Sequence, residues 1–103
     1  MAYGEVLAAM ADPTRRHILE ALRTQPKTVG ELAKDQPVSR PAVSQHLKVL
    51  ESASLVSVEP QGNSRVYSIK SDGLGDLRQY LEIFWSDAIS AYVAEIARLM
   101  NNE

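Results

Sequence analysis

Cysteine is absent from this sequence of 103 residues. Its absence excludes disulfide bonds, thiolate metal sites and thiol redox chemistry. No apolar run approaches the roughly 20 residues that a membrane-spanning helix needs. No signal-peptide pattern opens the chain, and no low-complexity tract interrupts it. We therefore expect a globular protein that works in the cytoplasm without a membrane.

The signatures of an enzyme are also missing. The chain holds two histidines, distant in sequence, and no glycine-rich phosphate loop. No pair of carboxylates falls in a predicted cleft, so no group is placed for acid–base or nucleophilic catalysis. We expect a binding protein and not an enzyme.

The length is that of one domain with a single modest core, covering residues 1–103. The net charge of −2 is unfavourable for binding nucleic acid, but the distribution of the charges matters more than their sum. Residues 14–70 hold nine Lys and Arg against five Asp and Glu, whereas residues 71–103 hold two against six. A polyanion would therefore bind to the middle of the chain.

The stretch 28–55 predicts a short helix, a tight break and a longer helix. Thr28 and Glu31 have the spacing of a capping box, in which each side chain bonds to the backbone of the other. Pro37 disfavours helical geometry in the residue before it and ends the first helix. Ser39 is a typical N-cap for the second.

The second helix separates its residues by face. Val43, Leu47 and Leu50 recur at helical spacing and are predicted to point inward. The outer face carries Arg40, Pro41, Ser44, Gln45 and Lys48. Two helices joined by a turn, the second polar and basic outside, form the arrangement that enters the major groove of DNA. An ordinary amphipathic helix with a solvated face is the alternative.

Two helices are predicted before this stretch. The first covers residues 3–10, and the second begins at Asp12-Pro13, a cap and first-turn pair, and runs to about Arg23. His17 is interpreted as a structural or surface residue, and residues 24–27 as a loop. The expected apolar sides are Val6, Leu7 and Met10 in the first helix and Ile18, Leu19 and Leu22 in the second. In the second helix, we expect the side chains of Arg15, Arg16 and Arg23 to point into solvent.

The periodicity changes after the second helix of the pair. Residues 56–70 alternate apolar and polar side chains around a predicted turn at 60–64, which indicates a β-hairpin. Tyr67 and Ile69 share a face and should pack on the helices. A hairpin in this place is a wing, whose Arg65 can reach phosphate or the minor groove. A solvated turn arginine is the alternative.

Residues 72–100 give one long helical pattern with an apolar stripe. A domain of this size can cover only part of that stripe, so the remainder should meet a partner. A second copy related by a two-fold axis is the economical partner. A helix folded wholly back on its own core is the alternative.

In this order of elements, the sequence resembles the ArsR family of bacterial winged-helix transcriptional repressors over nearly its full length. The matching residues are 11–16 (ADPTRR), Ile18, Leu19, 29–33 (VGELA), 43–50 (VSQHLKVL) and 65–67 (RVY). The resemblance implies homodimers that read palindromic operators, with the first and last helices at the interface. It also implies derepression by a metal or another signal.

Two departures limit that resemblance. Many relatives bind metal through cysteines in the helix that matches residues 29–35, and others through Asp and His in the last helix. This chain has no cysteine, and its last helix has carboxylates without histidine, so we expect no metal site and no cofactor. Pro37 stands where relatives often have Gly, so the turn must close without a positive φ there.

The predicted contacts with double-stranded DNA combine base reading and phosphate binding. Gln45 can pair with adenine, Arg40 can reach guanine or phosphate, and Ser44 can bond to bases. Predicted DNA contacts are Thr28, Ser39, Arg40, Ser44, Gln45, His46, Lys48, Ser64 and Arg65, with packing of His46 an equal alternative. Predicted dimer contacts are Val6, Leu7, Met10, Leu77, Leu81, Phe84, Trp85, Ile89, Tyr92 and Ile96.

We therefore expect a homodimeric, sequence-specific repressor of mainly α winged helix-turn-helix fold with a small β-hairpin. The alternative function is a winged-helix interaction module whose C-terminal helix docks a different chain. The sequence names no operator and no small-molecule inducer.

Overall fold

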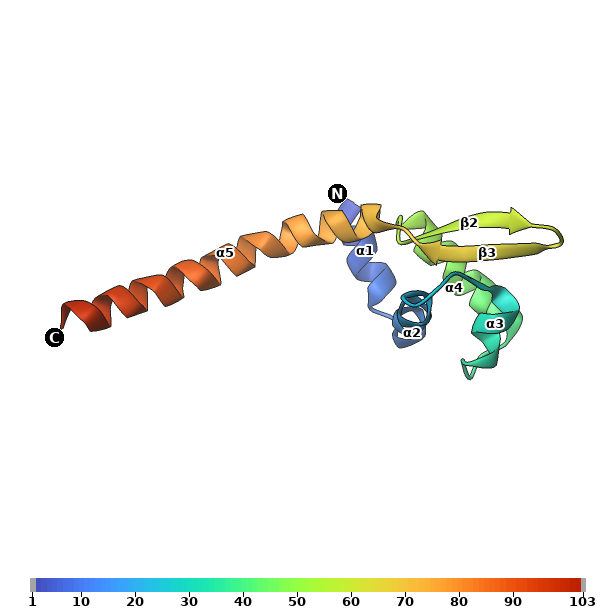
Figure 1. Cartoon of the computed structure of the whole chain (residues 1–103), viewed down its shortest axis with the longest axis horizontal. Coiled ribbons are helices and arrows are strands. Elements are labelled where there is room, and N and C mark those ends of the chain that lie inside the picture. Colours follow the sequence, from blue (N-terminus) through green and yellow to red (C-terminus); the bar gives the residue numbers. More distant parts are fainter. Residues whose placement is uncertain (1, 103) are drawn as a thin grey trace.

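The computed structural model describes residues 2–102 (Figure 1). Five helices and a small sheet form a mainly α fold with a wing, as the sequence predicted. In chain order the elements are α1 (Ala2–Met10), α2 (Pro13–Leu22), β1 (Lys27–Thr28), α3 (Val29–Lys34), α4 (Arg40–Ser52), β2 (Val56–Gln61), β3 (Ser64–Ile69) and α5 (Ser71–Asn101).

The helix starts are those that the local signals predict. Asp12 caps α2: its Oδ1 accepts from the backbone N–H of Thr14 at 2.8 Å and of Arg15 at 3.1 Å. The backbone N–H groups of Arg15 and then Thr14 hold the pKa of this carboxyl below its ordinary value. Thr28 and Glu31 form the predicted capping box at the start of α3. The hydroxyl of Ser39 accepts from the backbone N–H of Ala42 at the start of α4.

The sheet is larger than the sequence indicated. Its three antiparallel strands run in the order β1-β3-β2, so a third strand, β1, lies where we expected a loop. The predicted turn at 60–64 is wrong in length, because Gln61 pairs with Ser64 and leaves a two-residue loop. Gly62 makes that loop possible with a φ of +58°. The wing is therefore longer than expected.

The core lies between the helices and the inner face of the sheet. The predicted inward residues of α2 and α4 are all buried there, together with Tyr67 of β3. The buried apolar residues are Val6, Ala9, Ile18, Leu19, Leu22, Leu32, Val43, Leu47, Leu50, Ala53, Leu55, Val56 and Tyr67. Because one side of α4 is buried in this core, the opposite side of the helix faces solvent.

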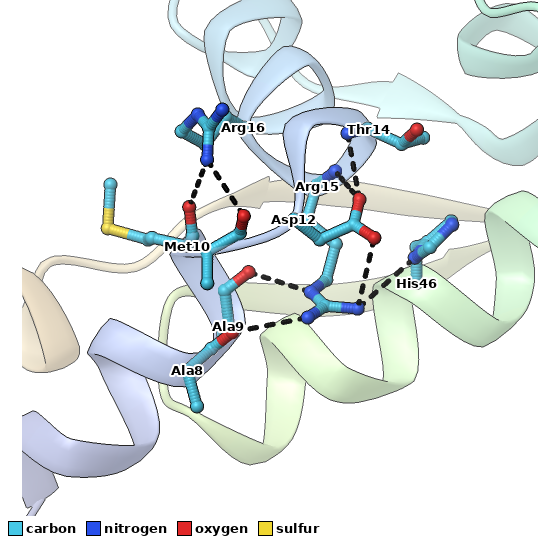
Figure 2. A network of polar contacts seen from close by, with 9 residues as sticks. Ala8, Ala9, Met10, Asp12, Thr14, Arg15, Arg16 and His46 are labelled. Atoms are coloured by element: carbon cyan, nitrogen blue, oxygen red, sulfur yellow. Dashed lines mark hydrogen bonds and ion pairs between the residues drawn. The ribbon is translucent and has the colours of Figure 1, made fainter.

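Arg15 is half-buried and does not extend into solvent as the sequence predicted, whereas Arg16 is exposed, as predicted. Both side chains bind the end of α1 (Figure 2). Arg15 donates to the carbonyls of Ala9 at 2.7 Å and Ala8 at 3.2 Å. Arg16 donates to the carbonyls of Met10 at 2.8 Å and Ala11 at 3.0 Å. These carbonyls lie where a helix leaves its acceptors unsatisfied and its dipole favours cations.

α5 starts against the end of α4 and then leaves the rest of the described fold, residues 2–80, which we call the body. Gly73 is buried there, and a Cβ at this position would lie 2.5 Å from the carbonyl oxygen of Ala53. Farther along, Tyr80 stacks on Tyr3 of α1 with ring centroids 4.2 Å apart. Every described residue from 81 onward is exposed, and Figure 1 shows this part extending away from the body.

The alternative in which the last helix folds wholly back on its own core is thus wrong. The molecule measures 69 Å in its longest dimension and 26 by 21 Å in the others. We call residues 81–101 of α5 the arm. No helix within residues 2–102 is both long enough and apolar enough to cross a bilayer.

Candidate nucleic-acid interface

α4 presents a polar and basic face beside the turn that joins it to α3. Gln45 and Lys48 are exposed and Ser44 is half-buried, whereas the opposite side of the helix is in the core. We call Ser44, Gln45 and Lys48 the reading face. All three have side chains that can hydrogen-bond to base edges or phosphates.

The turn between α3 and α4 closes without a left-handed residue. Asp35 ends α3 with a φ of −98°, and Ser39 precedes α4 with a φ of −73°. Among residues 2–102, positive φ is found at Ser54 and Gly62, and neither lies in this turn. The prediction that Pro37 requires a different closure from a glycine turn is therefore confirmed.

A basic hollow lies between the start of α3, the start of α4 and the tip of the wing. It has a volume of about 340 Å³. We call it the wing hollow; its lining residues are Thr28, Val29, Gly30, Arg40, Asn63, Ser64 and Arg65. The fold thus brings together four predicted DNA contacts from three segments of the chain. Neither guanidinium in the hollow forms an ion pair within the described part of the chain.

Gly30 leaves the space in which the end of the Arg40 side chain lies, a role that the sequence did not reveal. A Cβ built on Gly30 would lie 2.6 Å from Nη2 and 3.2 Å from Cζ of Arg40. The guanidinium therefore lies directly over the glycine, on the side of the helix pair that faces the wing. The pattern VGELA carried the signal, since a glycine in the first turn of a helix needs a reason such as close approach.

Thr28 and Ser39, two predicted DNA contacts, already use their hydroxyls as helix caps. The hydroxyl of Thr28 accepts from the backbone N–H of Glu31 at 3.2 Å and donates to the Glu31 carboxylate at 3.1 Å. The backbone N–H of Thr28, followed by its hydroxyl, lowers the pKa of Glu31. Any contact of these two residues with DNA must therefore be shared with capping.

His46 is half-buried and turned toward α2, apart from the reading face. Its Nδ1 lies 3.4 Å from Nη1 of Arg15 (Figure 2). Because a guanidinium can only donate, a hydrogen bond in this contact requires Nδ1 as the acceptor. His46 thus packs against α2 in this structure, and a contact of His46 with DNA stays a prediction.

The predicted dimer contacts divide between the body and the arm. Val6 is completely buried inside the chain, so its assignment to an interface with a second copy is wrong. Met10 and Leu77 are half-buried against the core, and Leu7 is exposed. The remaining predicted contacts are exposed and lie along α5: Leu81, Phe84, Trp85, Ile89, Tyr92 and Ile96.

No group of three or more His, Asp or Glu residues that could hold a metal ion comes together within residues 2–102. This finding concerns the single chain.

Comparison with known proteins identifies the family. Residues 12–58 match the family described as "Bacterial regulatory protein, arsR family". The HTH-type transcriptional regulator Rv2034 of Mycobacterium tuberculosis is 53% identical over 92% of this chain and 85% of its own length. The transcriptional repressor SdpR of Bacillus subtilis is 37% identical over 71% of this chain and 81% of its own length.

Solved structures agree with the sequence relatives. A possible transcriptional regulator for arsenical resistance is 40% identical, with a TM-score of 0.72 over 86% of this chain and 93% of that protein. An ArsR-like transcriptional regulator from Rhodococcus sp. RHA1 is 29% identical, with a TM-score of 0.75 over 90% of this chain and 88% of that one. The chain therefore belongs to the ArsR family of transcriptional regulators and is not an enzyme.

Proposed function

We propose that the protein is a homodimeric repressor that binds a palindromic operator in double-stranded DNA. The observation that carries the proposal is the wing hollow, which holds two arginines that form no ion pair within residues 2–102. The hollow includes the start of α4, the helix that carries the reading face. One part suits a polyanionic backbone and the other suits base edges, and specific DNA binding needs both.

In this proposal the two surfaces divide the work. The reading face enters the major groove, where Gln45 pairs with adenine and Ser44 and Lys48 contact neighbouring base edges or phosphates. Arg40 and Arg65 hold the phosphate backbone from the wing hollow. The position of Arg40 over Gly30 supports the phosphate role, because its guanidinium is directed toward the wing.

The arm supports assembly into a dimer. It is exposed on all sides, and its apolar side chains include Ile89, Tyr92 and Ile96 at helical spacing. A helix without tertiary contacts is marginally stable in water, and an apolar stripe of this length is costly to expose. A second copy, packed across a two-fold axis, covers both arms with the same surface.

The relatives of this chain support the proposal that it represses transcription and works in the cytoplasm. SdpR is named a transcriptional repressor, and a dimer that covers an operator can block transcription without a further domain. DNA is the expected partner, and the expected location is the cytoplasm, where bacterial DNA lies.

Selection of bound fragments from random DNA tests the proposal. We expect a palindrome whose half-sites lie about one duplex turn apart, roughly 34 Å. Recovery of no preferred sequence at low salt would contradict it. Capture of a heterologous partner by the arm would instead support an interaction module.

Two variants test the division of work. Gln45→Ala should cost about 1–3 kcal/mol at the base that it reads and relax specificity there. Arg65→Ala should weaken binding to all sequences alike and lower the salt slope by about one. Equal losses of both variants on operator and random DNA would contradict the assignment.

A further inference from the structure

Arg15 connects two helices that belong to different parts of the proposed function. Its Nε and Nη2 donate to the carbonyls of Ala9 and Ala8 at the end of α1, and its Nη1 contacts Nδ1 of His46 on α4. The side chain is 18% exposed, and Nη1 also lies 4.0 Å from the Asp12 carboxylate. One guanidinium thus bridges the end of α1, the cap of α2 and the middle of α4, which is the recognition helix in the proposed function (Figure 2).

Beside this bridge the two helices are separated by an open groove. The groove has a volume of about 440 Å³ and is lined by Arg15, by α1 and by the side of α4 that carries Gln45 and Lys48. Close packing therefore does not fix α1 against α4 along this side. The polar bridge links the two helices at the level of the reading face, in addition to the core in which Val6 and Ala9 of α1 are buried together with Leu47 and Leu50 of α4.

α1 is in turn held by α5. Tyr3 stacks on Tyr80, and Tyr80 makes an edge contact with Phe84, where the arm begins. A continuous series of contacts therefore runs from the arm through α1 to Arg15, His46 and α4. His46 is next to Gln45 in sequence, so movement of His46 moves the residue that reads adenine in the proposed function.

We propose that Arg15 is a positioning residue for DNA recognition: it fixes the recognition helix relative to the dimer helices by bonding the end of α1 to His46. The inference rests on the proposed function, because it assumes that α4 reads DNA and that α5 forms the dimer. Neither Arg15 nor His46 contacts a base in this mechanism. Their effect is on the orientation of Gln45, and hence on specificity.

Arg15→Ala and Arg16→Ala form a matched pair for the test. Both variants remove a guanidinium from the end of α1, but the Arg16 bonds reach only the carbonyls of Met10 and Ala11 and not α4. The readout is the ratio of affinities for operator and random DNA, measured where both variants are fully dimeric. Arg15→Ala should lower this ratio by roughly 5- to 20-fold, within the usual range for coupled sites, and Arg16→Ala should leave it unchanged.

Substitutions of His46 test the same bridge from the other side and do not disturb the end of α1. His46→Leu removes the acceptor and should lower the ratio as Arg15→Ala does. His46→Asn places an amide oxygen near the position of Nδ1 and should restore most of it. The double variant Arg15→Ala/His46→Leu should lose no more than either single variant, because both break the same contact.

The outcomes separate this inference from the proposed function. If the wild-type protein selects no operator, the proposed function fails. If it selects one and Arg15→Ala behaves like Arg16→Ala, the positioning role is wrong. Additive losses in the double variant would also overturn it, since His46 would then act on DNA independently of Arg15.

Discussion

The body and the arm of this chain are built from the same pattern of apolar residues and have opposite environments. In the body, Leu47 and Leu50 recur at helical spacing and are fully buried. In the arm, Ile89, Tyr92 and Ile96 also recur at helical spacing, and each is at least 40% exposed. Periodicity thus shows which side of a helix is apolar, but not whether the same chain covers that side.

The largest effect should come from a charge placed on the apolar stripe of the arm. Ile89→Glu should weaken dimerisation, and operator binding with it, by about 100-fold or more, because burying an unpaired carboxylate costs several kcal/mol. Sedimentation and operator titration measure the two losses. Ala94→Glu, on the opposite side of the same helix, is the control and should change neither.

A matched pair of leucines distinguishes the two regions directly. Leu47→Ala in the body should lower the free energy of unfolding by about 2–5 kcal/mol at every protein concentration, because it leaves a cavity in the core. Leu99→Ala in the arm should lower it by up to about 2 kcal/mol, and only at concentrations where the dimer forms. Urea unfolding at several protein concentrations checks both. Equal behaviour of the two variants would remove the distinction between body and arm.

A smaller effect is expected at Gly30, within the body. Gly30→Ala should displace Arg40 from the wing hollow and weaken binding to all DNA sequences by about tenfold, the loss of one charge-assisted contact. Gly75→Ala is the matched control, because a Cβ at Gly75 meets no atom within 4 Å. Titration of operator and random DNA measures the loss. A change confined to the operator would instead assign Arg40 to a base.

The smallest expected effect is the pH dependence of a helix cap in the body. The pKa of Asp12 is lowered in the folded chain, so its cap stabilises the fold above the ordinary carboxyl pKa of 3.8. That contribution is lost as the pH falls through the lowered folded value. Asp12→Asn keeps the accepting oxygen without titrating, and should flatten the fall in unfolding free energy below about pH 5. An unchanged pH dependence in the variant would show that other carboxylates cause the fall.

Local signals predicted the fold where the cause lies within a few residues. Thr28 and Glu31 cap α3, and Ser39 caps α4, because capping depends on side chains three residues apart. The sequence does not predict β1, because two residues have no periodicity and their pairing with β3 depends on residues far along the chain. The predicted turn of the wing is too broad because Pro60 indicates a loop, whereas Pro60 lies in β2 opposite Arg65.

The site was predicted only in part, for the same reason. Exposure of Gln45 and Lys48 follows from helical period alone. Arg15 was expected in solvent because its acceptors, the carbonyls of Ala8 and Ala9, belong to the preceding helix and carry no side-chain signal. The contact of Arg40 with Gly30 likewise depends on how α3 packs on α4, which no short pattern encodes.

Chemical footprinting of the selected operator tests the central proposal most directly, that two arms join two reading faces at a fixed separation. We expect two protected half-sites on one face of the duplex, about one turn apart, and loss of binding when about five base pairs are inserted between them. A single protected half-site, or binding that tolerates the insertion, would contradict the dimer and the palindrome together.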